Sequence, residues 1–286
     1  MFNISTIELE KKSVFFINSI LIILMIIFFL YDIPTSYFFY LNIILTFILS
    51  YLFFKRSKKL SKYIILTNMF IFFYFLYPHI SSFLYALLGE ESYIFILFYN
   101  ILIAYLFLLF SGQNKNLLND IKKFSFKILG LVVIIGLLFG LLFYFVKEPV
   151  PLNSIFNPMG SSYMIKVIFF TLILAISEQI IFSGFLYNTY KDLTHKKEAY
   201  FQVAVIFILF HMLRFESIIV NYVHNFNTYY LLLIAAYYIL LFLFMLASLH
   251  LYNFSSKKYS GNFIYAVMLH FITDLFMFYL IYLFGY

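Results

Sequence analysis

Long hydrophobic runs recur along the whole chain and alternate with short polar segments. Most runs reach about 18 residues or more, enough for an α-helix to cross a hydrocarbon core roughly 30 Å thick. The pattern therefore predicts an all-α fold, a polytopic bundle of about nine transmembrane helices. The predicted spans, with ends defined to within a few residues, are Ser13–Leu30, Tyr37–Phe54, Tyr63–Leu88, Tyr93–Phe110, Phe126–Val146, Tyr163–Tyr187, Ala199–Leu213, Tyr229–Tyr252 and Asn262–Phe284.

The positive charges alternate between the segments that separate these spans. Nearly all of the 19 Lys and Arg residues fall in every second segment, counted from the N-terminal tail. Loops rich in Lys and Arg stay in the cytoplasm, so we expect the N-terminus in the cytoplasm and the C-terminus outside. No small-residue cleavage site follows the first span, so we expect this span to stay as an anchor.

The composition fits a membrane protein and excludes several other classes. Hydrophobic residues make up 65% of the chain and charged residues only 11%, against about 25% charged in an average soluble domain. The net charge of +7 comes from Lys and Arg spread over many loops, so we expect lipids as partners and no nucleic acid. The absence of Cys excludes disulfides, thiolate metal ligands and a Cys nucleophile. The absence of Trp and Cys, with abundant Phe, Ile, Tyr, Lys and Asn, suggests an AT-rich bacterial genome. We expect the protein to lie in a bacterial cytoplasmic membrane.

Four ionisable side chains lie deep inside predicted spans: Glu178, His211, His270 and Asp274. At a rise of about 1.5 Å per residue they lie roughly 15, 18, 12 and 18 Å from the cytoplasmic ends of their helices. His270 and Asp274 are four residues apart and therefore share a helix face. Ionisable groups at this depth usually mark a functional interior, so we expect one buried pocket formed by three helices.

This pocket is compatible with several kinds of chemistry. A carboxylate beside a neutral imidazole can activate water, and a second such pair can orient the first or stabilise an oxyanion. The same four side chains can also hold a divalent metal such as zinc. Chains of Asp, Glu and His relay protons in transporters, although we find no paired broken helices or repeats here. The structural alternative is that each group simply makes hydrogen bonds between helices.

The sequence around these residues resembles the intramembrane proteases of the CAAX-processing and bacteriocin-processing family, often called CPBP or Abi. The family's first motif, Glu-Glu-x-x-x-Arg followed by Gly, corresponds here to Glu178-Gln-Ile-Ile-Phe-Ser-Gly184. Its second motif, Phe-x-x-x-His, corresponds to Phe207-Ile-Leu-Phe-His211. Its last motif, His-x-x-x-Asn or Asp, corresponds to His270-Phe-Ile-Thr-Asp274.

The order of these motifs on successive late spans makes the resemblance specific. It covers about Met159–Phe284, so we divide the chain into an N-terminal region of five spans, residues 1–158, and a catalytic-type core of four spans, residues 159–286. We recognise no motif in the N-terminal region, where a membrane partner protein could bind.

The resemblance also implies roles for the four deep residues. Glu178 would activate the attacking water with help from His211, whereas His270 and Asp274 would stabilise the oxyanion. No metal is firmly implied. The substrate would be a peptide bond close to the cytoplasmic surface of the membrane.

Gln179 and Ser183 stand where the family pattern has Glu and Arg. Losing both together removes a buried ion pair without leaving either charge unpaired. Our leading hypothesis is an intramembrane endopeptidase that cleaves a membrane-associated peptide or small protein, as in bacteriocin processing or immunity. The alternatives are a catalytically silent scaffold or regulator with the same fold, an immunity-type protein and, as a third class, a proton-coupled transporter.

Overall fold

The computed structural model describes residues 92–111, 125–146, 163–193, 196–214, 228–253 and 262–284, together with a few single positions before residue 92. All secondary structure in these residues is helical, which confirms the predicted fold class for this part of the chain. The helices are α4 (Ser92–Ser111), α6 (Phe126–Phe145), α7 (Tyr163–Gln179), η3 (Ile180–Tyr187), α8 (Asn188–Leu193), α9 (Lys196–Arg214), α11 (Thr228–Asn253) and α12 (Phe263–Phe284).

Four helical segments of the described residues are long and apolar enough to cross a membrane: Phe126–Phe145, Tyr163–Asp192, Leu231–Asn253 and Phe263–Phe284. The protein is therefore a membrane protein, as predicted. The helices at two further predicted spans, α4 and α9, are not among these four. The first three predicted spans lie outside the described residues, so the number of nine spans and the orientation stay predictions.

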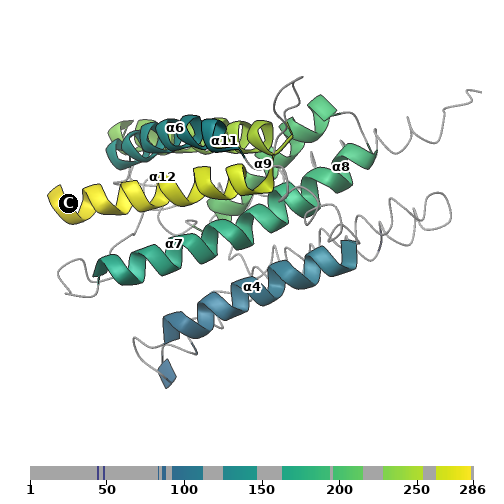
Figure 1. Ribbon diagram of the computed structural model, residues 1–286, viewed down its shortest axis with the longest axis horizontal. Coiled ribbons are helices and arrows are strands. Elements are labelled where there is room, and N and C mark those ends of the chain that lie inside the picture. The colour runs from purple at the N-terminus through teal and green to yellow at the C-terminus, as the bar shows by residue number, and fades with distance from the viewer. Residues whose placement is uncertain are drawn as a thin grey trace, which may run out of the picture. The chain divides into compact units, whose positions relative to one another are not determined.

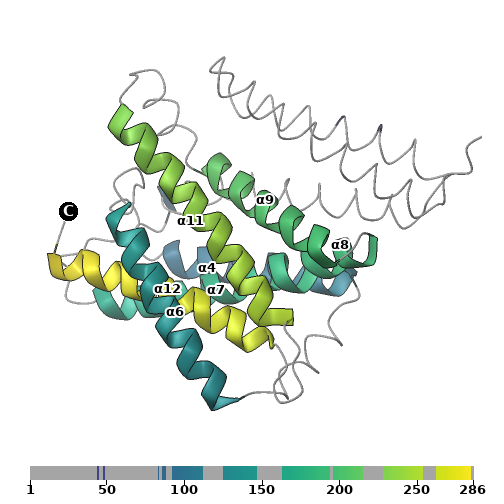
Figure 2. The same cartoon turned by 90° about the horizontal axis from the view of Figure 1, so that it is seen from above.

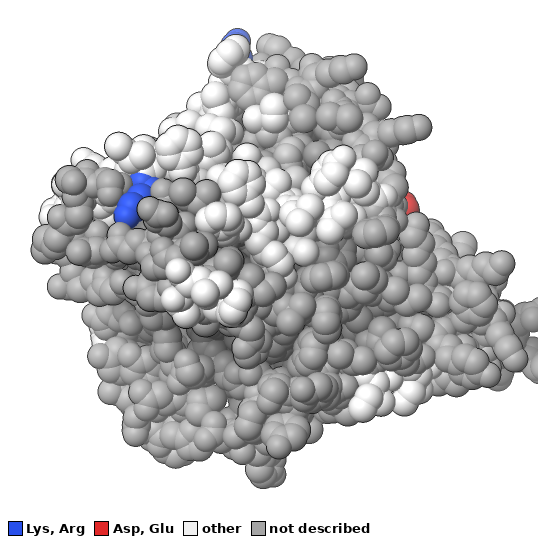
Figure 3. Space-filling model, turned by 90° about the horizontal axis from the view of Figure 1, so that it is seen from below, with Lys and Arg blue, Asp and Glu red and all other residues white. Residues whose placement is uncertain are grey.

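The outer surfaces of these helices suit a lipid environment. Figure 3 shows few charged side chains among the described residues on one face of the molecule. In water, so much exposed apolar surface would favour aggregation, whereas lipid tails solvate it. The large apolar side chains exposed on the helices include Leu131, Ile134, Phe169, Leu232 and Leu243.

The chain divides into two compact units. One consists of Met1–Tyr99 and Asn188–Ala199, and the other of Asn100–Tyr187 and Tyr200–Tyr286. All contacts discussed below join residues of the second unit. Within it, α12 lies between the pair α6 and α11 and the helix α7, and it packs against all three (Figures 1 and 2).

Two glycines allow α6 and α12 to approach closely. A Cβ atom at Gly136 would lie 2.8 Å from Ile272 Cγ2, and one at Gly140 would lie 2.7 Å from the carbonyl oxygen of Thr273. Both distances are shorter than van der Waals contact, so only glycine fits. The hydroxyl of Thr273 also donates to the carbonyl oxygen of Gly136 at 3.3 Å. The Gly-Leu-Leu-Phe-Gly segment is thus a small-residue packing motif of the kind common in membrane helices.

Aromatic side chains fill the space between α6 and α11. The ring of Phe244 packs edge-on against Phe139 and Phe143, with centroids 5.6 and 6.0 Å apart. It also packs against His270 on α12 at 5.1 Å. Edge-to-face contacts of this kind are favourable and directional. They fix the imidazole of His270 in an apolar setting on this side.

Helix α7 continues into a π-helical segment, η3, directly after Glu178 and Gln179. The segment is almost entirely buried, and Phe182, Ser183 and Phe185 are fully buried. Short π-helical segments are rare and occur frequently at functional sites, because they rotate the following side chains relative to the preceding ones. The end of η3 is anchored by Asn253 of α11, whose side-chain amide donates to the hydroxyl oxygen of Tyr187.

The start of α6 is tied to α12 by one buried hydroxyl. Tyr265 Oη accepts the backbone N–H of Ser125 at 2.5 Å, and Tyr265 is fully buried. We expect Tyr265→Phe to lower the free energy of unfolding by about 1–3 kcal/mol, because the N–H loses its acceptor in a partly buried position. Thermal melting in detergent measures this, with Tyr279→Phe at an exposed position as the control. Equal melting temperatures for the two variants would show that this bond contributes nothing.

Candidate active site

The site forms where the end of α7 faces the middle of α12. Glu178 and Gln179 occupy the last turn of α7, and His270 and Asp274 lie one turn apart on α12. Glu178 and His270 are each 4% exposed, whereas the side chain of Asp274 is 17% exposed. Asp274 is thus the most accessible of these acidic and imidazole groups, and the other two are enclosed.

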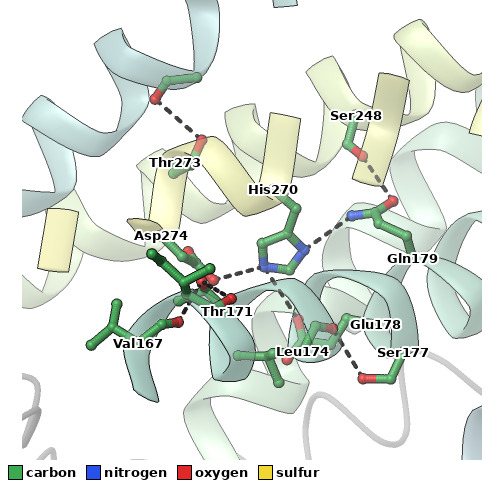
Figure 4. Close-up of polar contacts among 12 residues, drawn as sticks. Val167, Thr171, Leu174, Ser177, Glu178, Gln179, Ser248, His270, Thr273 and Asp274 are labelled. Carbon is green, nitrogen blue, oxygen red and sulfur yellow. Dashed lines mark hydrogen bonds and ion pairs between the residues drawn. The ribbon is translucent and has the colours of Figure 1, made fainter. Parts of the chain in front are cut away.

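One imidazole nitrogen lies between the two carboxylates. His270 Nε2 is 3.4 Å from Asp274 Oδ2 and 3.8 Å from Glu178 Oε2 (Figure 4). The structure therefore brings His270 and Asp274 together on one helix face, and it brings Glu178 to the same imidazole nitrogen. Since Phe244 and its neighbours exclude water on one side, electrostatic interactions within the cluster are stronger than they would be in water.

His211 of α9 belongs to the same unit and approaches the cluster through Phe207. His211 is 8% exposed, and its Nδ1 lies 2.8 Å from the carbonyl oxygen of Phe207. The ring of Phe207 lies 4.3 Å from that of His211 and 6.5 Å from that of His270. A carbonyl oxygen only accepts, so Nδ1 of His211 carries a proton, and Nε2 of the neutral ring is an acceptor. In this state His211 can assist a neighbouring general base by accepting a hydrogen bond through Nε2.

Gln179 and Ser183, which replace the Glu and Arg of the family pattern, form a neutral hydrogen-bonded pair. The Ser183 hydroxyl donates to Gln179 Oε1 at 2.6 Å. Gln179 Oε1 also accepts a bond from the Ser248 hydroxyl of α11 at 2.9 Å. Gln179, Ser183 and Ser248 are all fully buried. This protein thus has a neutral, hydrogen-bonded contact at the two positions where the family pattern has an acidic and a basic residue.

Ser248 and Thr273 lie beside the site, although neither was predicted from the sequence. Both are small polar residues inside apolar runs, and both are buried. Ser248 bonds to Gln179, and Thr273 joins α12 to α6 beside Asp274. The signal that could have identified them is a lone hydroxyl at membrane depth, because such a group usually bonds to another helix.

Whether the cluster could hold a metal ion depends on how its His, Asp and Glu side chains are arranged. The described residues contain no group of three or more His, Asp or Glu side chains arranged to hold a metal ion. The imidazole of His270 directs Nδ1 to the amide of Gln179 and Nε2 to the carboxylates. The zinc site considered from the sequence stays a prediction, and no step below depends on a metal.

A comparison with protein families matches residues 160–276 to the type II CAAX prenyl endopeptidase Rce1-like family. No curated protein and no solved structure shows a significant match. The matched range contains Glu178, His211, His270 and Asp274, and it agrees with the range of the predicted resemblance. The family prediction is therefore confirmed.

Proposed function

Because residues 160–276 of this chain match the type II CAAX prenyl endopeptidase Rce1-like family, we propose that the protein is an intramembrane endopeptidase. Its substrate is a peptide bond of a membrane-associated peptide or small protein. The observation that carries this proposal is the buried contact of His270 Nε2 with both Glu178 and Asp274. An imidazole between two carboxylates at membrane depth is costly to build without a chemical use.

In the proposed reaction, Glu178 acts as the general base. Its carboxylate takes a proton from a water molecule, and the resulting hydroxide attacks the carbonyl carbon of the scissile peptide bond. Nε2 of His211 assists by accepting a hydrogen bond from the same water. The burial of Glu178 supports this role, because the interaction of its carboxylate with a bound water is stronger where bulk water is excluded.

The tetrahedral intermediate then needs a donor for its negative oxygen. His270 supplies the Nε2–H group, which Asp274 Oδ2 accepts at 3.4 Å in the resting site and which the oxyanion accepts in its place as its negative charge develops. Collapse of the intermediate breaks the carbon–nitrogen bond. Glu178 returns its proton to the leaving amine, so that no proton is gained or lost over the cycle.

The proposed setting follows the charge pattern of the sequence. We place the protein in the bacterial cytoplasmic membrane, with nine spans, the N-terminus in the cytoplasm and the site reached from that side. Lipids surround the helices, and the substrate approaches along the membrane surface. The exposed apolar faces of α6, α7 and α11 support the lipid contacts.

The test compares wild type with Glu178→Ala and His211→Ala in the native host at matched expression. Mass spectrometry of membrane-associated peptides reports the cleavage. We expect both variants to abolish a cleavage that wild type performs. The control is Ser177→Ala, because Ser177 is adjacent to Glu178 but its hydroxyl bonds to the carbonyl oxygen of Leu174 on its own helix.

A second candidate function is a catalytically silent scaffold that binds a partner protein in the membrane. The observation that favours it is the replacement of the family's Glu and Arg by Gln179 and Ser183. A scaffold requires the fold but not the base. Identical peptide patterns in wild type, Glu178→Ala and His211→Ala, with unchanged cellular function, would support this candidate over the protease.

A further inference from the structure

The amide of Gln179 has a defined orientation. Its oxygen faces two hydroxyl groups, Ser183 Oγ at 2.6 Å and Ser248 Oγ at 2.9 Å. Its nitrogen faces Nδ1 of His270 at 3.3 Å (Figure 4). The amide oxygen accepts from two hydroxyl groups, and the amide nitrogen faces one ring nitrogen. Both ends of this fully buried amide therefore have hydrogen-bond partners. The amide therefore presents N–H to the imidazole.

This orientation determines which nitrogen of His270 carries the proton. An amide N–H only donates, so Nδ1 of His270 must be an acceptor and cannot be protonated. The neutral ring then carries its hydrogen on Nε2. That nitrogen faces the oxygens of Asp274 and Glu178, which accept hydrogen bonds when ionised. Donors and acceptors alternate without conflict from the serines through Gln179 and His270 to the carboxylates.

A carboxylate in place of the amide would have the opposite effect. Glu offers only acceptor oxygens when ionised, so at position 179 it would favour a proton on Nδ1 of His270. It would also place a third negative charge beside Glu178 and Asp274 in a buried cluster, which is strongly unfavourable. An amide and a carboxylate at position 179 therefore favour different protonation states of His270.

We infer that Gln179, held by Ser183 and Ser248, is a positioning residue that fixes His270 as the Nε2–H tautomer and points that N–H toward the reacting groups. This inference rests on the proposed function for its catalytic consequence. The tautomer itself is a property of the resting protein. It can therefore be measured whether or not a substrate is known.

The experiment is ¹⁵N and ¹³C NMR of the full chain in lipid bilayers at neutral pH, with labelled His. The protein has six His residues, and the signals of His270 are assigned by their loss in His270→Gln. We expect wild type to show a protonated Nε2 and an unprotonated Nδ1. A protonated Nδ1 in wild type, in either the neutral or the cationic ring, would overturn the inference. This measurement needs no variant of Gln179 to fold.

Two variants test the cause. We expect Gln179→Glu to move the proton onto Nδ1, and Gln179→Leu to give a mixture of the two tautomers. Spectra of Gln179→Leu identical to those of wild type would show that the amide does not set the tautomer, and would also overturn the inference. Ser177→Ala is the control and should leave the His270 signals unchanged, because its hydroxyl bonds within α7.

Cleavage assays give a separate result. We expect Gln179→Leu to lower kcat about tenfold to a hundredfold, with KM changed less than about twofold, because a misdirected donor affects the transition state more than substrate binding. A larger change in KM than in kcat would contradict a positioning role. If NMR shows the expected tautomer but wild type cleaves nothing, the proposed function fails and the assignment of the tautomer stands.

Discussion

Replacing Glu178 by Gln should lower the cleavage rate about a thousandfold, whereas replacing Asp274 by Asn should lower it about tenfold or less. The two changes are chemically identical, since each exchanges a carboxylate for an amide of the same shape. A general base must take a proton, which an amide cannot do. Asp274 instead accepts a bond from His270 at 3.4 Å, and the side-chain oxygen of Asn can accept the same bond.

The measurement is the rate of product formation in isolated membranes, normalised to the amount of folded protein. The family pattern also admits Asn at the position of Asp274, which agrees with the smaller expected effect. Asp274→Ala is the matched comparison, because it removes the acceptor and should cost more than Asp274→Asn. Equal losses for Glu178→Gln and Asp274→Asn would contradict the different roles that we propose for the two carboxylates.

Introducing Leu at Gly140 should prevent the native packing of α6 on α12. Even the first atom of a side chain would lie 2.7 Å from the carbonyl oxygen of Thr273, and a backbone atom cannot move aside without moving its helix. Overpacking costs about 1–3 kcal/mol for small additions and more for large ones, so Gly140→Ala should be destabilised and Gly140→Leu unfolded or repacked. Thermal melting and size-exclusion profiles in detergent report both effects.

The control for this prediction lies on the same helix. A Cβ at Gly130 meets nothing within 4 Å, and the residue is exposed. Gly130→Leu should therefore melt at or above the temperature of wild type, since Leu favours helix more than Gly does. Similar melting of Gly130→Leu and Gly140→Leu would show that α6 and α12 do not pack as closely as the structure has them. Because Thr273 precedes Asp274, Gly140→Ala should also reduce cleavage.

The helices that the structure describes were predictable because their signal is local. The predicted spans Tyr93–Phe110 and Phe126–Val146 differ from α4 and α6 by one residue at most at each end. The predicted span Tyr163–Tyr187 lies inside the helical segment that begins at Tyr163, although its π-helical part was not expected. The start of α9 at Lys196 lies three residues before the predicted span, because charged residues extend a helix beyond its apolar run.

The sequence by itself determined the membrane environment, the helical class, the family and the shared face of His270 and Asp274. These follow from apolar runs, from motif order and from the helical repeat, which all act over a few neighbouring residues. Only the tertiary structure decided which partners complete the site. Ser248 and Gln179 are 69 residues apart, and Gly136 and Thr273 are 137 apart. Such pairs meet only when several helices pack together. The residues next to a serine or a glycine in the chain carry no signal of the distant residue that it will contact.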